Sequence, residues 1–281
     1  MRRAARHCLV VVLPALLLPA AQAAERLVAI GGAVTEIVYA LGAADRLVAV
    51  DSTSRYPAPA TRLPDIGYLR ALSAEPILAL KPDLIVHAED AGPPEAMAQL
   101  RAAGVPLVAI PDAPTVDGVE AKIRATAAAL GHEDAADALV ERLRRELAAA
   151  RAGIDADAAR PRVVFVMQFE AGSMLAAGRG TAADAIIELA GGINVGADFT
   201  SYKPLGAESL LAARPDVVVT VDRAMAGYTD AAEVLALPAL RLTPAAAAGR
   251  LVVMDALLLL GFGPRLGEAV ANLASALHAA P

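Results

Sequence analysis

Short runs of apolar residues alternate with longer amphipathic stretches along most of the chain. The apolar runs, rich in Val, Ile, Leu and Ala, predict buried strands over residues 27–30, 47–50, 84–86, 107–110, 163–167, 217–221 and 251–254. The stretches between them have apolar residues at helical spacing and Gly or Pro at their boundaries, and they predict helices over 35–41, 94–102, 181–190 and 264–278. Buried strands that alternate with helices indicate an α/β fold with central parallel sheets covered by helices on both faces.

Two segments in different halves of the chain have closely similar sequences. Residues 72–86 read LSAEPILALKPDLIV and residues 205–219 read LGAESLLAARPDVVV, with eight of fifteen positions identical at a constant offset of 133. Each segment predicts a short helix that ends at Lys81 or Arg214, a Pro that stops the helix, and a buried strand. We therefore expect two similar Rossmann-like lobes, one in each half of the chain.

The region between the two halves is predicted to be helical. Residues 133–152 contain neither Gly nor Pro, which indicates a helix about 30 Å long. This helix is either an ordinary crossover inside one domain or a rigid connector between two lobes, and we favour the connector. The expected organisation is a first lobe over 24–114, a helical connector over 115–157 and a second lobe over 158–281, with little difference between free and bound forms.

The first residues have the pattern of a targeting segment. Arg2, Arg3 and Arg6 precede an apolar run over 8–18, and Ala21-Gln22-Ala23 fits the small-residue rule for cleavage. The run is short for a membrane span and contains Pro14, so an uncleaved anchor is the less favoured alternative. We predict a signal peptide over 1–23 that is removed, and a soluble mature protein in the bacterial periplasm.

Composition and charge narrow the classes of function. The chain has 281 residues, a formal net charge of −6 and one Cys, which excludes a disulfide framework, a Cys-based zinc site and a basic nucleic-acid-binding surface. The four His have no paired spacing, so a His-rich metal centre is not expected. Signals of catalysis are weak. Loops at Gly31-Gly32 and at 178–180 leave open an exported α/β enzyme that holds a phosphorylated ligand through backbone N–H groups.

The repeat indicates where a ligand binds. Ligands of open parallel sheets lie beyond the carboxyl ends of the strands, so two facing lobes form a cleft there. Residues 65–70 and 198–203 lead into the two copies of the repeat, and each loop carries a Tyr, Tyr68 or Tyr202, close to a cation. These tyrosines either face the cleft or pack locally. Glu75 and Glu208 are also related by the repeat; each either stabilises the first turn of its helix or forms one of two matched carboxylates that a symmetric partner could grip.

Four motifs resemble one known family. They are DIGYLRALSAE over 65–75, AGRGTAAD over 177–184, YKPL over 202–205 and LGFGPR over 260–265. The mature chain as a whole resembles the periplasmic solute-binding proteins of bacterial importers for vitamin B12, ferric siderophores and haem, and these motifs are similar to the haem branch. The resemblance implies two lobes joined by one long helix. It also implies a monomer without enzymatic activity. Such a protein takes part in iron acquisition by carrying ferric haem to an ABC permease dimer, whose associated ATPase hydrolyses ATP.

The resemblance also implies roles for single residues. Tyr68 is the expected axial ligand of the haem iron, and either Arg70 or Arg223 would support the tyrosinate or pair with a haem propionate. Further expected contacts with haem come from charged and apolar side chains, namely Lys203, Arg179, Tyr202, Phe262, Phe199, Met174, Met225 and Tyr228. Glu75 and Glu208 are expected to dock onto Arg pockets of the permease. Cobalamin or a ferric siderophore is the alternative ligand within this class of protein.

Overall fold

The structure is a computed structural model that describes residues 25–155, 157, 159–169 and 173–279. The predicted signal peptide over 1–23 lies outside the described residues. Over the part of the chain that is described, no helix has both the length and the apolar composition needed to cross a membrane.

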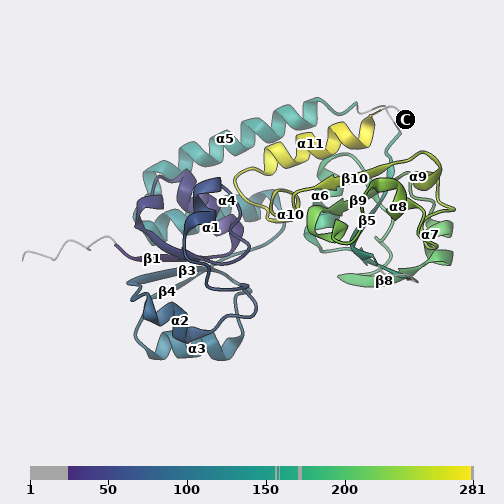
Figure 1. Ribbon diagram of the computed structural model, residues 1–281. Helices are drawn as coiled ribbons and strands as arrows, with labels where there is room; N and C mark the ends of the chain where they lie inside the picture. The colour runs from purple at the N-terminus through teal and green to yellow at the C-terminus, as the bar shows by residue number, and fades with distance from the viewer. Residues whose placement is uncertain (1–24, 156, 158, 170–172, 280–281) are drawn as a thin grey trace, which may run out of the picture.

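The first sheet has four parallel strands in the order β2-β1-β3-β4. The strands are β1 (Leu27–Ile30), β2 (Leu47–Val50), β3 (Leu84–Ala88) and β4 (Leu107–Ile110). All four were predicted, and only β3 extends beyond its predicted range. In Figure 1, α1 (Gly32–Ala40) and α4 (Val116–Leu130) cover one face of this sheet, and α2 (Ala74–Ala79) and α3 (Pro94–Ala102) cover the other. This arrangement is the predicted parallel α/β layer structure.

The second sheet is mixed, so the prediction of a parallel sheet is wrong for part of this lobe. Its order is β10-β9-β5-β6-β8, with β7 beside β5, and β6 and β8 each run antiparallel to their neighbours. The strands are β5 (Arg162–Phe169), β6 (Ser173–Ala177), β7 (Ile193–Asn194), β8 (Tyr202–Gly206), β9 (Val217–Val221) and β10 (Leu251–Met254). The edge strand β8 contains Pro204 and Gly206, which weaken the sequence signal of a strand.

Two long helices run side by side, one reaching from the first lobe to the second and the other lying along it over the second lobe (Figure 1). Helix α5 (Glu133–Ala152) has the bounds that the sequence predicts, and α11 (Leu266–His278) lies along it. Gly267 has no room for a side chain, because a Cβ there would lie 2.4 Å from the Cβ of Glu146. The connector helix therefore packs along a helix from the end of the chain and does not join the lobes by itself. The remaining helices are α6 (Ala182–Leu189), α7 (Ala207–Ala213), α8 (Ala231–Leu235), α9 (Pro244–Ala247) and α10 (Ala256–Leu260).

The sequence repeat corresponds to a structural repeat. Helices α2 and α7 begin at Ala74 and Ala207, which are equivalent positions, and each leads into a central strand of its sheet. Both are followed by a residue with left-handed backbone, Lys81 at φ 49° and Arg214 at φ 47°. Two non-glycine residues with the same unusual conformation at equivalent positions show that the repeat extends to backbone geometry.

A single hydrophobic core continues from the first lobe into the second. It contains fully buried residues of β1 and β3, of α5 and α11, and of one face of β5 and β9, the face on which α6 packs. A smaller core lies on the opposite face of the second sheet, under α8 and α9. Because the larger core is continuous through the connector, rotating one lobe against the other would expose apolar surface to water.

A buried ion pair joins the first lobe to the start of α11. Arg265 donates from Nε to Oε2 of Glu36 at 2.9 Å and from Nη2 to Oε1 at 2.5 Å, and its guanidinium lies 3.7 Å from the centre of the Tyr56 ring. The Glu36 side chain is only 4% exposed. Burial raises the pKa of Glu36, and the hydrogen bonds from Arg265 counteract part of that effect.

We expect Glu36→Ala to lower the free energy of unfolding by about 3 kcal/mol, because it leaves a partly buried guanidinium without its carboxylate. Urea unfolding at neutral pH measures the change. Asp137→Ala is the matched control, since the Arg124–Asp137 pair is exposed and its loss should cost less than about 1 kcal/mol. Equal losses in the two variants would contradict a stabilising role for the buried pair.

The predicted strand over 84–86 placed His87 just beyond its end. In the structure, His87 lies inside β3. It is 6% exposed, and its Nδ1 lies 2.9 Å from the carbonyl oxygen of Ala88. Burial lowers the pKa of His87 below its ordinary value of 6.5. Just below pH 6.5, His87 therefore binds a proton in the unfolded chain but stays neutral in the folded chain.

We expect the free energy of unfolding to fall as pH decreases from 6.5 towards the lowered pKa of folded His87, since only the unfolded state binds the proton there. His87→Gln should remove this part of the pH dependence. Urea unfolding of both proteins at about pH 7.5 and about pH 5.5 measures it. If the two proteins lose the same stability between these pH values, His87 is not the responsible group.

Candidate functional site

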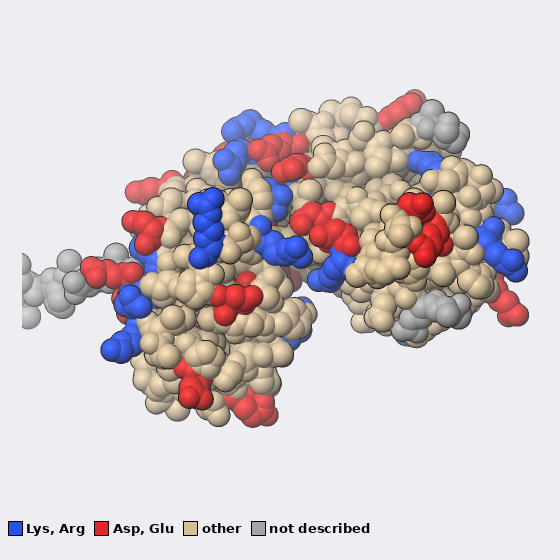
Figure 2. Space-filling model, in the orientation of Figure 1, with Lys and Arg blue, Asp and Glu red and all other residues tan. Residues whose placement is uncertain are grey.

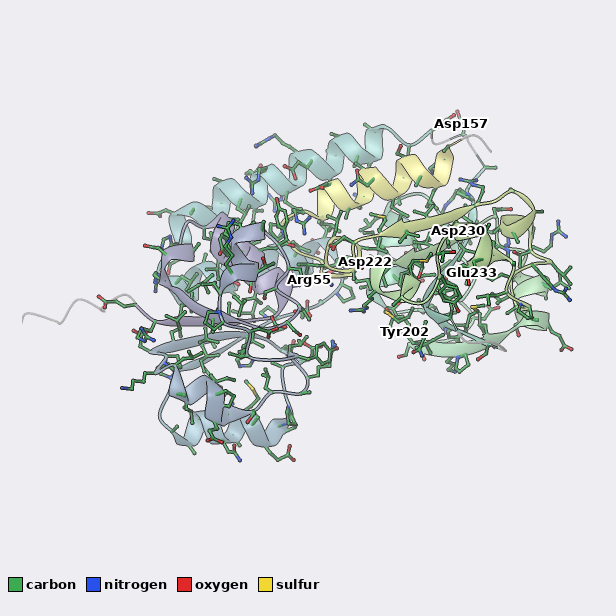
Figure 3. All side chains as sticks on the ribbon, viewed as in Figure 1. Arg55, Asp157, Tyr202, Asp222, Asp230 and Glu233 are labelled. Atoms are coloured by element: carbon green, nitrogen blue, oxygen red, sulfur yellow. The ribbon has the colours of Figure 1, made fainter. Side chains whose placement is uncertain are left out.

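A cleft of about 530 Å³ lies between the two lobes. Its lining comes from segments that follow the carboxyl ends of the strands, including Gly31 after β1, Asp90 after β3, Asp112 after β4 and Arg223 after β9. Figure 2 shows acidic and basic side chains close together where the two lobes meet, and Figure 3 shows Arg55 and Asp222 in this region. The cleft is therefore where the strand directions predict a ligand.

The loop that carries Tyr68 is attached to the ends of two strands. Asp65 pairs with Val50 of β2, and its Oδ1 accepts a hydrogen bond from the Gly67 amide at 2.8 Å. Gly67 has φ 94°, which an L residue rarely adopts. The carbonyl oxygen of Gly67 accepts a hydrogen bond from the amide of Ser52 at 3.0 Å. The carbonyl oxygen of Leu69, the residue after Tyr68, accepts one from the amide of Gly92 at 2.8 Å. These backbone bonds hold Tyr68 at the cleft from both sides.

Tyr68 presents its hydroxyl to a cation of the same loop. The Nη1 atom of Arg70 donates to the Tyr68 hydroxyl oxygen at 2.6 Å, and the Nη2 atom forms an ion pair with Asp90. Tyr68 is 43% exposed. The arrangement provides an accessible phenol whose oxygen lies beside a positive charge, and that charge is itself oriented by a carboxylate.

The second lobe contributes Tyr202 and Arg223. Tyr202 begins β8, and burial raises its pKa above the ordinary value of 10.0, although Arg223, a hydrogen bond with Thr181 and Arg70 act in the opposite direction. Its ring packs edge-on against Phe165, with centroids 6.5 Å apart, and Figure 3 shows it on the side of the lobe that faces the first lobe. The Nη2 atom of Arg223 lies 3.3 Å from the sulfur of Met167.

Apolar residues of α10 and the turn after it form the floor of the cleft. Leu257, Leu260 and Phe262 line it, and Phe262 is only 2% exposed. Gly32 allows α10 to approach the first lobe, since a Cβ at Gly32 would lie 2.6 Å from Cδ1 of Leu257 and 2.5 Å from the carbonyl oxygen of Thr53. The floor thus depends on a close contact between a helix of the second lobe and the start of α1.

The structure brings together five of the predicted contact residues and leaves others out. Tyr68, Arg70, Tyr202, Arg223 and Phe262 all line the cleft. Lys203 is not among the residues that line the cleft, since successive residues of a strand point to opposite sides and Tyr202 faces the cleft. Its Nζ lies 5.8 Å from the centre of the Phe199 ring instead.

Arg179 and several apolar residues also lie outside the lining of the cleft. The backbone of Arg179 pairs with that of Phe199 and Ser201, and its side chain is exposed. Met174 is fully buried in β6 within the smaller core, against which other predicted wall residues pack, namely Phe199, Met225 and Tyr228. Residues 198–203 were expected to form a loop, whereas residues 202 and 203 begin β8.

The two glycine loops do not offer free donors to a phosphate. The amide of Gly31 donates to Asp51 at 2.8 Å and the amide of Gly32 donates to Thr53 at 2.9 Å. In the second loop, the amides of residues 178, 179 and 180 donate to Ser201, Phe199 and Asp184. The phosphorylated-ligand alternative therefore loses the groups on which it depended.

Within the described ranges, no group of three or more His, Cys, Asp or Glu side chains is placed to hold a metal ion.

The sequence reasoning did not identify Asp90, Met167 and Lys122, which also line the cleft. Asp90 lies a few residues after a predicted buried strand. Its place beyond the carboxyl end of that strand is the sequence feature that could have identified it. Lys122 lies within α4, where sequence gives no sign that a lysine is buried.

Glu75 and Glu208 lie outside the cleft at equivalent positions. Each is the second residue of its helix, α2 or α7, and each is exposed. The structural repeat therefore presents one carboxylate on each lobe.

Comparison with known proteins gives consistent matches. The family model described as periplasmic binding protein matches residues 27–258. The structure resembles the periplasmic heme-binding protein RhuT from Roseiflexus sp. RS-1 in its apo form, with 42% identity, a TM-score of 0.87, and coverage of 90% of this chain and 98% of that one. It also resembles the periplasmic heme-binding protein BhuT in complex with two hemes, with 46% identity, a TM-score of 0.84 and the same coverage.

A third match is to a protein with a different ligand. The vitamin B12-binding protein of Yersinia pseudotuberculosis serotype O:1b (strain IP 31758) is 32% identical over 212 residues, which is 75% of this chain and 74% of that protein.

Proposed function

We propose that this chain, which belongs to the periplasmic binding protein family, binds ferric haem in the cleft between its lobes and delivers it to the permease of an ABC importer. The observation that carries the proposal is the Tyr68 phenol in the cleft, with its oxygen 2.6 Å from the guanidinium of Arg70. The two heme-binding proteins at 42% and 46% identity support haem as the ligand. The periplasm is the compartment that we propose, from the family and from the predicted signal peptide.

Tyr68 would bind the iron through its phenolate oxygen. Tyrosine is an established proximal ligand of haem iron, and its anionic oxygen suits the ferric state. Arg70 supports this role because its guanidinium balances the negative charge of the phenolate, and Asp90 keeps the guanidinium in place. Of the two cations that the sequence left open, Arg70 contacts Tyr68 and Arg223 does not, so we assign support of the tyrosinate to Arg70.

Other residues of the cleft would hold the rest of the haem. Arg223 lies on the opposite lobe beside Met167 and suits a propionate carboxylate, since a guanidinium donates two parallel hydrogen bonds to such a group. Leu257, Leu260 and Phe262 offer an apolar surface to the macrocycle. Tyr202 would act as a wall residue, because the burial that raises its pKa disfavours its phenolate.

Cobalamin is the second candidate ligand, and the relative at 32% identity favours it. Haem explains the Tyr68–Arg70 pair better, because the pair places an accessible phenol oxygen, a suitable ligand for ferric iron, beside a guanidinium. We propose no catalytic activity, since the family and its relatives are binding proteins and the backbone donors of both glycine loops are occupied.

Glu75 and Glu208 would dock onto the permease. Both are exposed in the first turn of repeat-related helices, so they form a matched pair that a twofold-symmetric partner can contact. Arg side chains are the usual complement to such carboxylates. ATP would be hydrolysed by the ATPase of the importer.

We expect hemin to saturate the mature protein at one equivalent and give a ferric high-spin visible spectrum. Tyr68→Ala and Tyr68→Phe should abolish that spectrum and weaken affinity by at least about 100-fold, because loss of outer-shell groups alone often costs about 10- to 100-fold. Tyr202→Phe, at the other tyrosine of the cleft, is the matched control and should retain the spectrum.

A Tyr68→Phe spectrum identical to that of the wild type would refute the ligand assignment. Saturation at two equivalents would match the BhuT complex with two hemes and would add a second haem to the site. If the wild-type protein does not bind hemin, the haem proposal fails, and titration with cyanocobalamin tests the second candidate.

We expect the double variant Glu75→Ala with Glu208→Ala to bind hemin normally but to support much slower haem uptake by importer reconstituted in vesicles, because it removes both docking carboxylates. Glu95→Ala is the matched control, since Glu95 is an exposed second residue of α3. Uptake at the wild-type rate by the double variant would remove the docking role.

A further inference from the structure

The floor of the cleft ends in a turn with an unfavourable backbone conformation. Gly261 and Phe262 follow α10, and Phe262 has φ 45° in spite of its bulky side chain. Left-handed backbone brings the Cβ of an L residue too close to its own backbone, so it persists only where other contacts enforce it. Phe262 is also part of the lining of the cleft. The contacts that enforce its conformation therefore affect the shape of the site.

Those contacts come from a buried lysine of the other lobe. The side chain of Lys122 in α4 is 2% exposed. Its Nζ donates to the Phe262 carbonyl at 2.9 Å, to the Gly261 carbonyl at 3.2 Å and to Oδ1 of Asp112 at 2.5 Å. An ammonium group has three protons, and three protein acceptors surround this one. Although Lys122 lines the cleft, none of its donors remains for a ligand.

The residue type fits this geometry. The chain has three lysines among its 25 basic residues, and one of them is at this buried position. An ammonium is compact and directs three donors tetrahedrally, whereas a guanidinium is a planar fork that suits two parallel acceptors. Three acceptors around one nitrogen atom therefore select lysine over arginine.

We propose that Lys122 is a positioning residue for ligand binding. By bonding the carbonyls of Gly261 and Phe262, it holds Phe262 in the left-handed conformation and keeps α10 against the first lobe. The apolar floor is then already formed before a ligand enters, and a preformed floor lowers the ordering cost of binding. This inference rests on the proposed function only in that the ligand of the cleft is taken to be haem.

The test compares Lys122→Met with Arg250→Met. Methionine keeps the length of the lysine side chain but has no charge and no donor. Arg250 is a matched control because its Nη2 also donates to two carbonyls, those of Ala276 at 2.9 Å and Leu277 at 2.8 Å, near the end of α11. Neither of those acceptors lines the cleft.

Two measurements report on the floor. Hydrogen exchange of the Leu259 and Gly261 amides, which donate within α10 to Asp255 and Leu257, is measured in the ligand-free protein under native conditions. The rate of hemin dissociation is measured by transfer to a scavenger. We expect Lys122→Met to raise both by about tenfold, the scale of one charge-assisted hydrogen bond. Arg250→Met should change neither, even where it lowers global stability as much.

Unchanged exchange at Leu259 and Gly261 in Lys122→Met, or the same increase in Arg250→Met, would overturn the proposal. Asp112→Asn provides a second test if Lys122→Met does not fold, since it keeps the ammonium but removes its carboxylate. It should raise exchange at the same two amides by a smaller factor, and no increase would also overturn the proposal. Failure of the wild type to bind hemin would refute the proposed ligand, whereas the exchange measurement would still test Lys122.

Discussion

The shape of the cleft depends on how one short segment, from Gly261 to Arg265, is bonded to the first lobe. Lys122 holds the carbonyls at its start, and Glu36 holds the guanidinium at its end. Both contacts involve buried charges, and a buried charge without a partner is strongly destabilising. The segment therefore has one favourable position, and that position determines where α10 and α11 lie. Since α10 forms the cleft floor and α11 packs along α5, these contacts connect the ligand site with the join between the lobes.

The same contacts constrain motion. A wide opening of the lobes would separate Lys122 and Glu36 from their partners and expose the core that continues through α5 and α11. The cleft walls are different, because Tyr68, Arg70 and Arg223 are attached to loops beyond the strand ends and keep exposed surface. The molecule thus combines a rigid floor with walls that can adjust by side-chain movement.

Much of the fold follows from local sequence, and the failures have a common cause. The Val- and Leu-rich strands of both lobes and the Gly-free helix α5 were predicted because burial and helix formation leave periodic signals. Strand β8 was missed because its sequence, YKPLG, has no apolar run, and β6 was missed because the apolar run of its sequence, SMLAA, is only four residues long. Neither Lys203 nor Met174, which lie in these two strands, lines the cleft, since strand pairing determines which side chains face it. Asp90 and Lys122 were missed because their partners, Arg70 and the Phe262 carbonyl, are distant in sequence, and only the tertiary fold brings them together.

The two tyrosines show how one repeat gives two different chemical environments. Tyr68 and Tyr202 stand in loops or strand ends that precede the two copies of the repeat, and both reach the same cleft. Tyr68 lies in a loop before α2 and is not itself paired in a sheet. Its hydroxyl therefore stays accessible, and its oxygen lies 2.6 Å from a guanidinium nitrogen. Tyr202 starts a strand that pairs with β6, so its ring packs against Phe165 and burial raises its pKa. Burial therefore disfavours an anionic oxygen at Tyr202, whereas Tyr68 keeps an exposed hydroxyl beside a guanidinium. The added strand pairing of the second lobe, rather than any difference in residue type, is what distinguishes a candidate iron ligand from a wall residue.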